Sequence, residues 1–114
     1  NGNRWFQDST FGNPTADIDS GSVRMFAGSG VSYGLPTTNQ SQHFLVFNGA
    51  NSAGSLNGAV VSGDAGANTL GGIIIGSRLS SSNYLDGTVQ ELIVYPSDQS
   101  ANRERIEGDL AWYY

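Results

Sequence analysis

The sequence predicts an all-β fold, an antiparallel β-sandwich that ends in one C-terminal helix, and three observations lead to this prediction. Only 13% of the residues are charged, and glycine alone accounts for 16 of the 114 positions. Apolar residues recur in short blocks between polar turns, as in proteins built from short strands. After Pro96 the apolar residues change to helical spacing. At this length we expect a single domain, residues 1–114.

The first half of the chain contains three expected strands separated by turn-forming residues. Residues 4–9 and 22–27 are the first two strands. A loop is expected over residues 11–16, and a long polar stretch runs from 28 to 42. Residues 43–48, His-Phe-Leu-Val-Phe-Asn, are apolar on both faces and predict a buried central strand.

The second half continues this pattern and carries the clearest turn signal. Asn57 and Gly58 predict a hairpin, because an Asn-Gly pair supplies the two positive φ angles of a type I′ turn. A glycine-rich loop is expected over residues 63–72 and a strand over 72–76. Residues 88–95 predict the longest strand, which is apolar on both faces apart from one glutamine and one glutamate.

The chain ends in a predicted amphipathic helix of about three turns. Residues 97–100 offer N-cap side chains, and Arg103, Ile106 and Leu110 recur at helical spacing. The aromatic end of this helix, residues 112–114, is expected to pack on the sheet or on a neighbouring subunit.

From Gln42 to Tyr114, the order of these elements resembles the C-terminal portion of a concanavalin A-like, or laminin G-like, jelly roll. The matching stretches are residues 43–47, 56–58, 63–66, 73–76, 83–87, 89–95 and 102–111. Residues 95–107 further resemble the ends of such domains in bacteriophage structural proteins. A complete domain of this family is longer. The resemblance therefore implies a reduced sandwich, or the C-terminal part of a longer chain whose open sheet edge another subunit covers.

The resemblance implies a lectin-like module, and the chain offers candidate groups for binding a glycan. Sugars stack on exposed aromatic rings, and Tyr33 and Tyr84 lie in expected loops. Polar side chains of neighbouring loops would bind the sugar hydroxyls. The candidate ligand-binding residues are Tyr33, Asp64, Asn68, Asn83, Tyr84 and Asp86.

Calcium is the one cofactor that the resemblance implies, since laminin G-like domains often hold it at the loop rim with carboxylate oxygens. Asp17, Asp19 and Asp64 are the candidate metal ligands. If residues 17–19 form a strand, the side chains of Asp17 and Asp19 point to the same face. Turn hydrogen bonding is the alternative explanation of aspartates in loops.

No catalytic residues are expected, although a remnant glycoside hydrolase stays open as an alternative. Glycosidases of the related fold place a glutamate at each end of an alternating strand, whereas threonine and glycine flank Asp17 and Asp19 here. His43 is the only histidine, so a serine triad or a zinc site would depend on it without identifiable partners.

The charge balance and the hydropathy exclude two classes of partner. Five arginines, no lysine and a net charge of −5 disfavour nucleic acid. No apolar run approaches ~18 residues, so we expect no membrane insertion. The sequence therefore predicts a non-enzymatic surface module of a virion or another extracellular assembly, which binds a glycan for adhesion or decorates the particle. A purely structural or capping subunit without sugar binding is the alternative. Other subunits of the assembly are expected partners in both cases.

Overall fold

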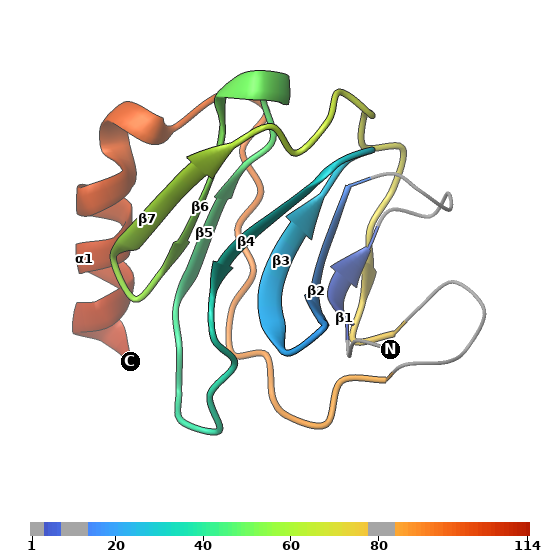
Figure 1. Ribbon diagram of the computed structural model, residues 1–114. Helices are drawn as coiled ribbons and strands as arrows, with labels where there is room; N and C mark the ends of the chain where they lie inside the picture. The colour runs from blue at the N-terminus through green and yellow to red at the C-terminus, as the bar shows by residue number, and fades with distance from the viewer. Residues whose placement is uncertain (1–3, 8–13, 78–83) are drawn as a thin grey trace.

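The chain forms two antiparallel β-sheets and one C-terminal α-helix in the computed structural model, which describes residues 4–7, 14–77 and 84–114 (Figure 1). Over these residues the larger sheet has the strand order β4-β3-β2-β1-β8 and the smaller one β5-β6-β7. The strands are β1 (Arg4–Gln7), β2 (Thr15–Asp19), β3 (Ser22–Phe26), β4 (Gly30–Gly34), β5 (His43–Val46), β6 (Ser52–Leu56), β7 (Ala59–Gly63) and β8 (Ile74–Ile75). The helices are the 3-10 helices η1 (Gly49–Asn51) and η2 (Ser100–Asn102) and the α-helix α1 (Arg103–Tyr113). Antiparallel sheets followed by one helix agree with the prediction.

Two hairpin turns follow from residues that adopt positive φ angles. Asn57 and Gly58 join β6 to β7 with φ angles of 50° and 84°, which confirms the predicted hairpin. Ser20 and Gly21 join β2 to β3 in the same way, with φ angles of 51° and 79°. Both loops are two residues long, so each fixes the register of its strand pair.

The hydrophobic core lies where β3 and β4 of the larger sheet pack against the smaller sheet. Its buried members are Val23, Met25, Val31, Tyr33 and Ala65. The Tyr33 ring packs directly on β6, where a Cβ atom added at Gly54 would lie 2.6 Å from the ring. In the same way, a Cβ atom at Gly34 would lie 2.5 Å from the Leu56 side chain. Glycine at these two positions therefore lets the two sheets approach closely.

Strands β2 and β4 differ from the sequence prediction. The expected loop over residues 11–16 overlaps β2, which begins at Thr15. The expected polar stretch over residues 28–42 contains β4, in which Val31 and Tyr33 are buried while the residue between them is exposed. Two inward-facing apolar residues are too few for a clear sequence signal, and β4 forms because it pairs with β3.

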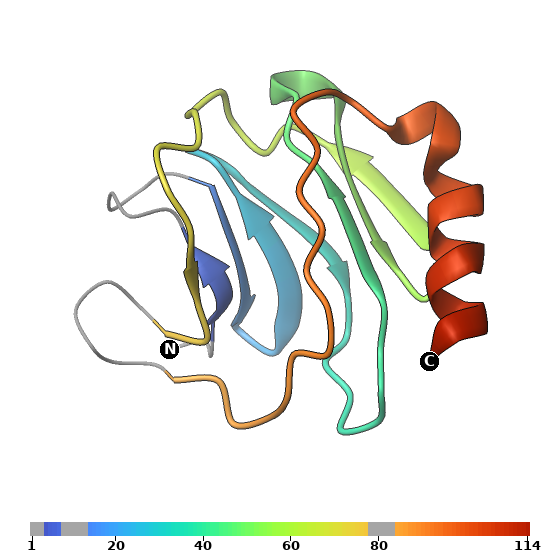
Figure 2. The same cartoon turned by 180° about the vertical axis from the view of Figure 1, so that it is seen from behind.

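Residues 88–95 are the largest departure from prediction, because they belong to no strand. They run as an extended trace across the back of the molecule, on the side that faces the viewer in Figure 2. Val89, Leu92, Ile93, Val94 and Tyr95 are all exposed along this trace. The prediction of a paired strand is therefore wrong for the chain as it stands, although the apolar character that prompted it is real.

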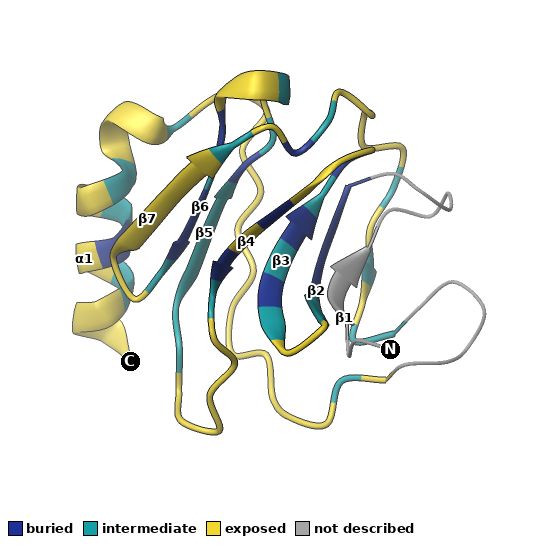
Figure 3. Cartoon of the chain, in the orientation of Figure 1, coloured by how far each residue is buried: buried dark blue, intermediate teal, exposed yellow. Residues whose placement is uncertain are grey.

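Helix α1 packs on the smaller sheet through one face only. Arg103, Ile106 and Leu110 are half-buried and Glu107 is buried, which matches the predicted helical spacing. The remaining surface of the helix is exposed, as Figure 3 shows in yellow. The helix follows a turn in which the Asp98 carboxylate accepts hydrogen bonds from the amide and the hydroxyl of Ser100.

Candidate functional site

Tyr33, a candidate for sugar stacking, does not lie in a loop. It belongs to β4, and only 2% of its surface is exposed. Its hydroxyl lies 3.1 Å from Nδ1 of His43. A ring enclosed in this way offers no face to a sugar, so the prediction of a loop position for Tyr33 is wrong.

Asp64 and Asn68 lie in the loop after β7, as expected, and both stabilise the loop itself. The Asp64 carboxylate accepts a 2.8 Å hydrogen bond from the Gly66 amide, which is an Asx turn. The Asn68 amide donates to the carbonyl of Ala27, 2.9 Å away. This arrangement joins the loop to the end of β3.

The segment of residues 84–87, which contains Tyr84 and Asp86, lies at the opposite end of the molecule from that loop (Figure 1). Tyr84 is 61% exposed, and Asp86 lines a small hollow together with Ser41 and His43. Asn83 lies outside the described residues. The structure therefore does not bring the described ligand-binding candidates together at one site.

Asp17 and Asp19 project from β2 to one side, and both bind Arg24 of β3. Arg24 donates two hydrogen bonds to the Asp17 carboxylate, at 3.0 and 2.9 Å, and its Nη1 lies 2.8 Å from Asp19 Oδ2. The two carboxylates thus face the same way, as predicted. The hydrogen bonds from Arg24 to Asp17 raise the pKa of Arg24 further. Asp17 is buried and Asp19 is half-exposed.

The proposed metal ligands are not gathered into a cluster. Within residues 4–7, 14–77 and 84–114, no three His, Asp or Glu side chains lie in a group that could hold a metal ion. Asp17 and Asp19 are instead engaged by Arg24, and Asp64 forms its own turn. The contacts described here for the three carboxylates are therefore structural ones within the fold.

His43 opens β5 and has two polar neighbours that the sequence did not single out. Its Nδ1 lies 3.1 Å from the Tyr33 hydroxyl, and its Nε2 lies 3.0 Å from the Ser41 hydroxyl. Burial lowers the pKa of His43 below its ordinary value of 6.5, which favours the neutral form of the ring. Ser41 and His43 meet the distance of a nucleophile and its base, but a phenol lies behind the imidazole where serine hydrolases place a carboxylate.

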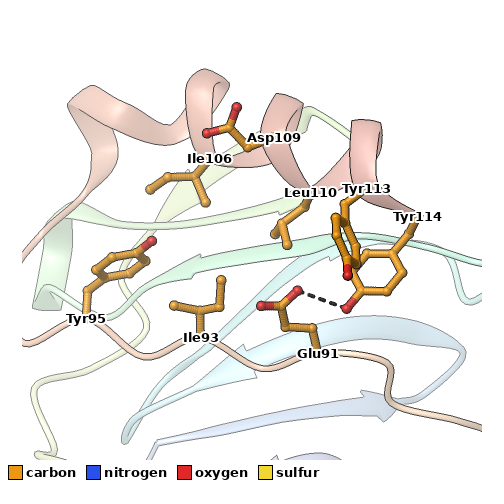
Figure 4. A pocket seen from close by; sticks show the side chains of 8 residues that line it. All are labelled: Glu91, Ile93, Tyr95, Ile106, Asp109, Leu110, Tyr113 and Tyr114. Carbon is orange, nitrogen blue, oxygen red and sulfur yellow. Dashed lines mark hydrogen bonds between the residues drawn. The ribbon is translucent and has the colours of Figure 1, made fainter.

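A groove separates residues 91–95 from helix α1. Glu91, Ile93 and Tyr95 line one wall, and their side chains point toward the helix in Figure 4. Helix residues Ile106, Asp109, Leu110, Tyr113 and Tyr114 line the other wall. The groove encloses about 390 Å³, and the Tyr114 hydroxyl donates a 3.0 Å hydrogen bond to Glu91 across its end.

Large apolar side chains that neighbour the groove-lining residues in sequence are also exposed. Leu92 and Val94 are 46% and 55% exposed, and Trp112 at the end of the helix is 92% exposed. The sequence predicts that Trp112 and the two tyrosines after it pack on the sheet or on a neighbouring subunit. Within this chain Trp112 does not pack on the sheet.

The position of α1, and hence of the groove, depends on a buried carboxylate that the sequence analysis missed. Glu107 accepts a 2.6 Å hydrogen bond from the Ser55 hydroxyl of β6 and forms an ion pair with Arg103. The Gln42 side chain donates to the backbone carbonyl of Glu107, 3.0 Å away. Helical spacing could have indicated this role, because Glu107 follows Arg103 by four residues and so lies on the same face.

Comparisons with family models, curated proteins and solved structures find no match to the chain. Across the described residues, the helices are too short and too polar to span a bilayer. The groove, the exposed apolar residues beside it and the buried contact of Glu107 are therefore the observations from which a function can be argued.

Proposed function

We propose that this chain is a non-enzymatic assembly module that docks on another subunit of a larger particle. Docking uses the assembly surface, which we define as residues 89–95 together with the end of α1, residues 109–114. The observation that carries the proposal is that large apolar and aromatic side chains are exposed on both walls of one groove, Ile93 and Tyr95 on one wall and Tyr113 on the other.

Exposed apolar surface has an unfavourable free energy in water. Contiguous apolar patches on a soluble monomer are uncommon beyond a few hundred Å², and larger ones mark interaction sites. The exposed set combines aliphatic residues with Tyr113 and a nearly free Trp112, and aromatic side chains are enriched where interfaces gain most of their energy. A partner that covers Leu92, Val94 and Trp112 would remove this apolar surface from water.

We also propose that the two sheets belong to a laminin G-like sandwich of the jelly-roll type, carried on a virion or another extracellular assembly. The support is the ordered resemblance of residues 42–114 and the low charged content of 13%. The observed antiparallel sheets and terminal helix agree with this class.

Glycan binding is a second candidate function, favoured by one observation. Tyr84 presents an exposed ring, and two residues later Asp86 lines a hollow that Thr37 and Ser41 also line. An aromatic face beside hydroxyl and carboxylate groups is the chemistry that holds a sugar. A glycan array, probed in calcium and again with chelator, tests this candidate. Binding that a Tyr84→Ala variant loses would support it, and no binding by the folded chain would reject it.

A remnant glycoside hydrolase has the weakest support of the three functions. Asp17 is only 2% exposed, and both it and Asp19 are bound to Arg24. A carboxylate must reach the glycosidic bond to act as acid or nucleophile. Glycan hydrolysis that an Asp19→Asn variant loses would overturn the proposal that the module is not an enzyme.

Incorporation into the parent assembly tests the leading proposal. A variant with Leu92→Ser and Trp112→Ser should fold with a free energy of unfolding within about 1 kcal/mol of the original, because both side chains are exposed. It should nevertheless fail to enter the particle. A matched control, Glu104→Ser with Arg105→Ser, changes exposed residues earlier in α1 and should enter normally. Normal incorporation of the first variant would overturn the proposal.

A further inference from the structure

We infer that residues 88–95 form a β-strand that lacks neighbours in the isolated chain, and that the docking partner supplies the strand that pairs with it. This inference deepens the proposed function and rests on it. The partner strand is apolar and carries an arginine or lysine opposite Glu91.

The side chains of this segment alternate as those of a strand do. Glu91, Ile93 and Tyr95 line the groove, and Figure 4 shows all three pointing to the helix side. Gln90 instead bonds to Gln40, at 2.9 Å. Side chains that are two residues apart share one face here, which is the period of a β-strand.

The backbone of the segment, by contrast, has no ladder. Over the described part of the chain, residues 88–95 make no backbone–backbone hydrogen bond and belong to no strand pair. Valine, isoleucine, leucine and tyrosine make up most of the segment, a composition that favours strands. An apolar extended backbone with free donors and acceptors is a template for strand addition.

The charge of the groove selects the partner. Glu91 and Asp109 both line it, and among the described lining residues there is neither arginine nor lysine. The chain itself carries a net charge of −5, which disfavours a second copy in this place. A basic side chain directly across from Glu91 would form a favourable cross-strand pair. Apolar residues across from Leu92 and Val94 would cover their exposed surface.

A tethered strand provides the test without knowledge of the natural partner. The Tyr114 hydroxyl bonds to Glu91, so the C-terminus lies close to the segment. A strand of alternating valine and threonine with one central arginine would be appended to the intact chain through a flexible glycine–serine linker of about ten residues. The linker raises the effective concentration of the strand to the order of millimolar, which makes weak pairing measurable.

The readout is amide hydrogen exchange at residues 88–95, measured by NMR. In the chain as it exists these amides should exchange without protection. The tethered arginine strand should slow alternate amides by about tenfold or more, because pairing engages every second N–H on one edge. A tether with glutamate in place of arginine should protect them less, and Glu91→Gln should shrink that difference. A tether interrupted by prolines should give no protection.

Several results would overturn the inference. One is protection of these amides in the untethered chain, either in the monomer or in a self-associated form. The others are no protection by the arginine tether, and protection by the proline tether equal to that by the arginine tether. Such a failure is distinguishable from failure of the proposed function, since the Leu92→Ser and Trp112→Ser variant would still be excluded from the particle if docking does not use strand pairing.

Discussion

The Ser55 hydroxyl donates a 2.6 Å hydrogen bond to the Glu107 carboxylate, and this buried contact joins β6 to α1 across 52 residues of sequence. Arg103 pairs with the other carboxylate oxygen one helical turn earlier. The polar contact therefore holds the helix at the position that opens the groove toward residues 91–95. Because Glu107 is buried, its carboxylate has to be hydrogen-bonded to be tolerated there.

Removal of this carboxylate should loosen the helix. Glu107→Ala leaves the Ser55 hydroxyl without its acceptor, so the free energy of unfolding should fall by about 1–3 kcal/mol. Urea denaturation followed by far-UV circular dichroism measures the change. Glu104→Ala, at a side chain that is 90% exposed, should stay within about 0.5 kcal/mol of the original chain. Equal effects of the two substitutions would contradict the anchoring role of Glu107.

Loss of Arg24 should destabilise the larger sheet. Arg24→Met removes the guanidinium that binds the buried Asp17 carboxylate, and breaking a fully buried ion pair costs about 3–5 kcal/mol. Since 24% of the Arg24 side chain is exposed to water, we expect about 2–3 kcal/mol here. Adding Asp17→Asn to Arg24→Met should restore part of the loss, and thermal denaturation would measure both. A double variant no more stable than Arg24→Met would argue against the lost ion pair with Asp17 as the cause.

Close packing of the two sheets should make Gly54 intolerant of a side chain. A Cβ atom there would lie 2.6 Å from the Tyr33 ring, so Gly54→Ala should cost about 1–3 kcal/mol through overpacking. Gly58→Ala meets no neighbour but needs a φ angle of 84°, so it should cost about 1 kcal/mol through backbone strain. Chemical denaturation of both variants compares the two mechanisms. A larger loss for Gly58→Ala would contradict the described contact between β4 and β6.

Stability should fall on acidification through the titration of His43. Burial lowers the pKa of this ring in the folded chain below 6.5, so the unfolded chain binds the proton more readily. The stabilisation that His43 provides is therefore fully present above pH 6.5. It is lost as the pH falls through the folded pKa, by no more than about 1.4 kcal/mol per pH unit.

Two measurements check this sign. NMR titration of the single histidine should give a folded pKa below 6.5. The free energy of unfolding of a His43→Gln variant should depend less steeply on pH between about 5 and 7. The carboxylates are the same in both chains and contribute equally to both. A folded pKa above 6.5, or an unchanged pH dependence in the variant, would contradict the burial of a neutral ring against Tyr33 and Ser41.

Sequence reasoning located the features that depend on neighbours in the chain. The Asn57-Gly58 hairpin was predictable because the turn requires positive φ angles that few other residue pairs supply. The helix was predictable from its spacing, and so was the shared face of Asp17 and Asp19. Each of these is a local property of the backbone.

Features that depend on long-range contacts were missed. Tyr33 lies in a stretch of glycine and serine, and contacts that are distant in sequence, among them the close approach of Gly54 from the other sheet, bury its ring. From the sequence Glu107 is expected to face solvent, and its burial depends on the contact with Ser55, which is distant in sequence. Residues 88–95 have the composition of a paired strand, yet pairing needs a neighbour that the described chain does not place beside them.

Site-specific photo-cross-linking is the most direct test of the central claim that the assembly surface docks on another protein. A photoreactive phenylalanine analogue would replace Trp112, and in a matched control it would replace Glu104 at an equally exposed position earlier in α1. In the organism that makes the particle, we predict a single, abundant cross-link from position 112 to a different subunit and none from position 104. Absence of a cross-link at 112, or the same products from both positions, would contradict the account.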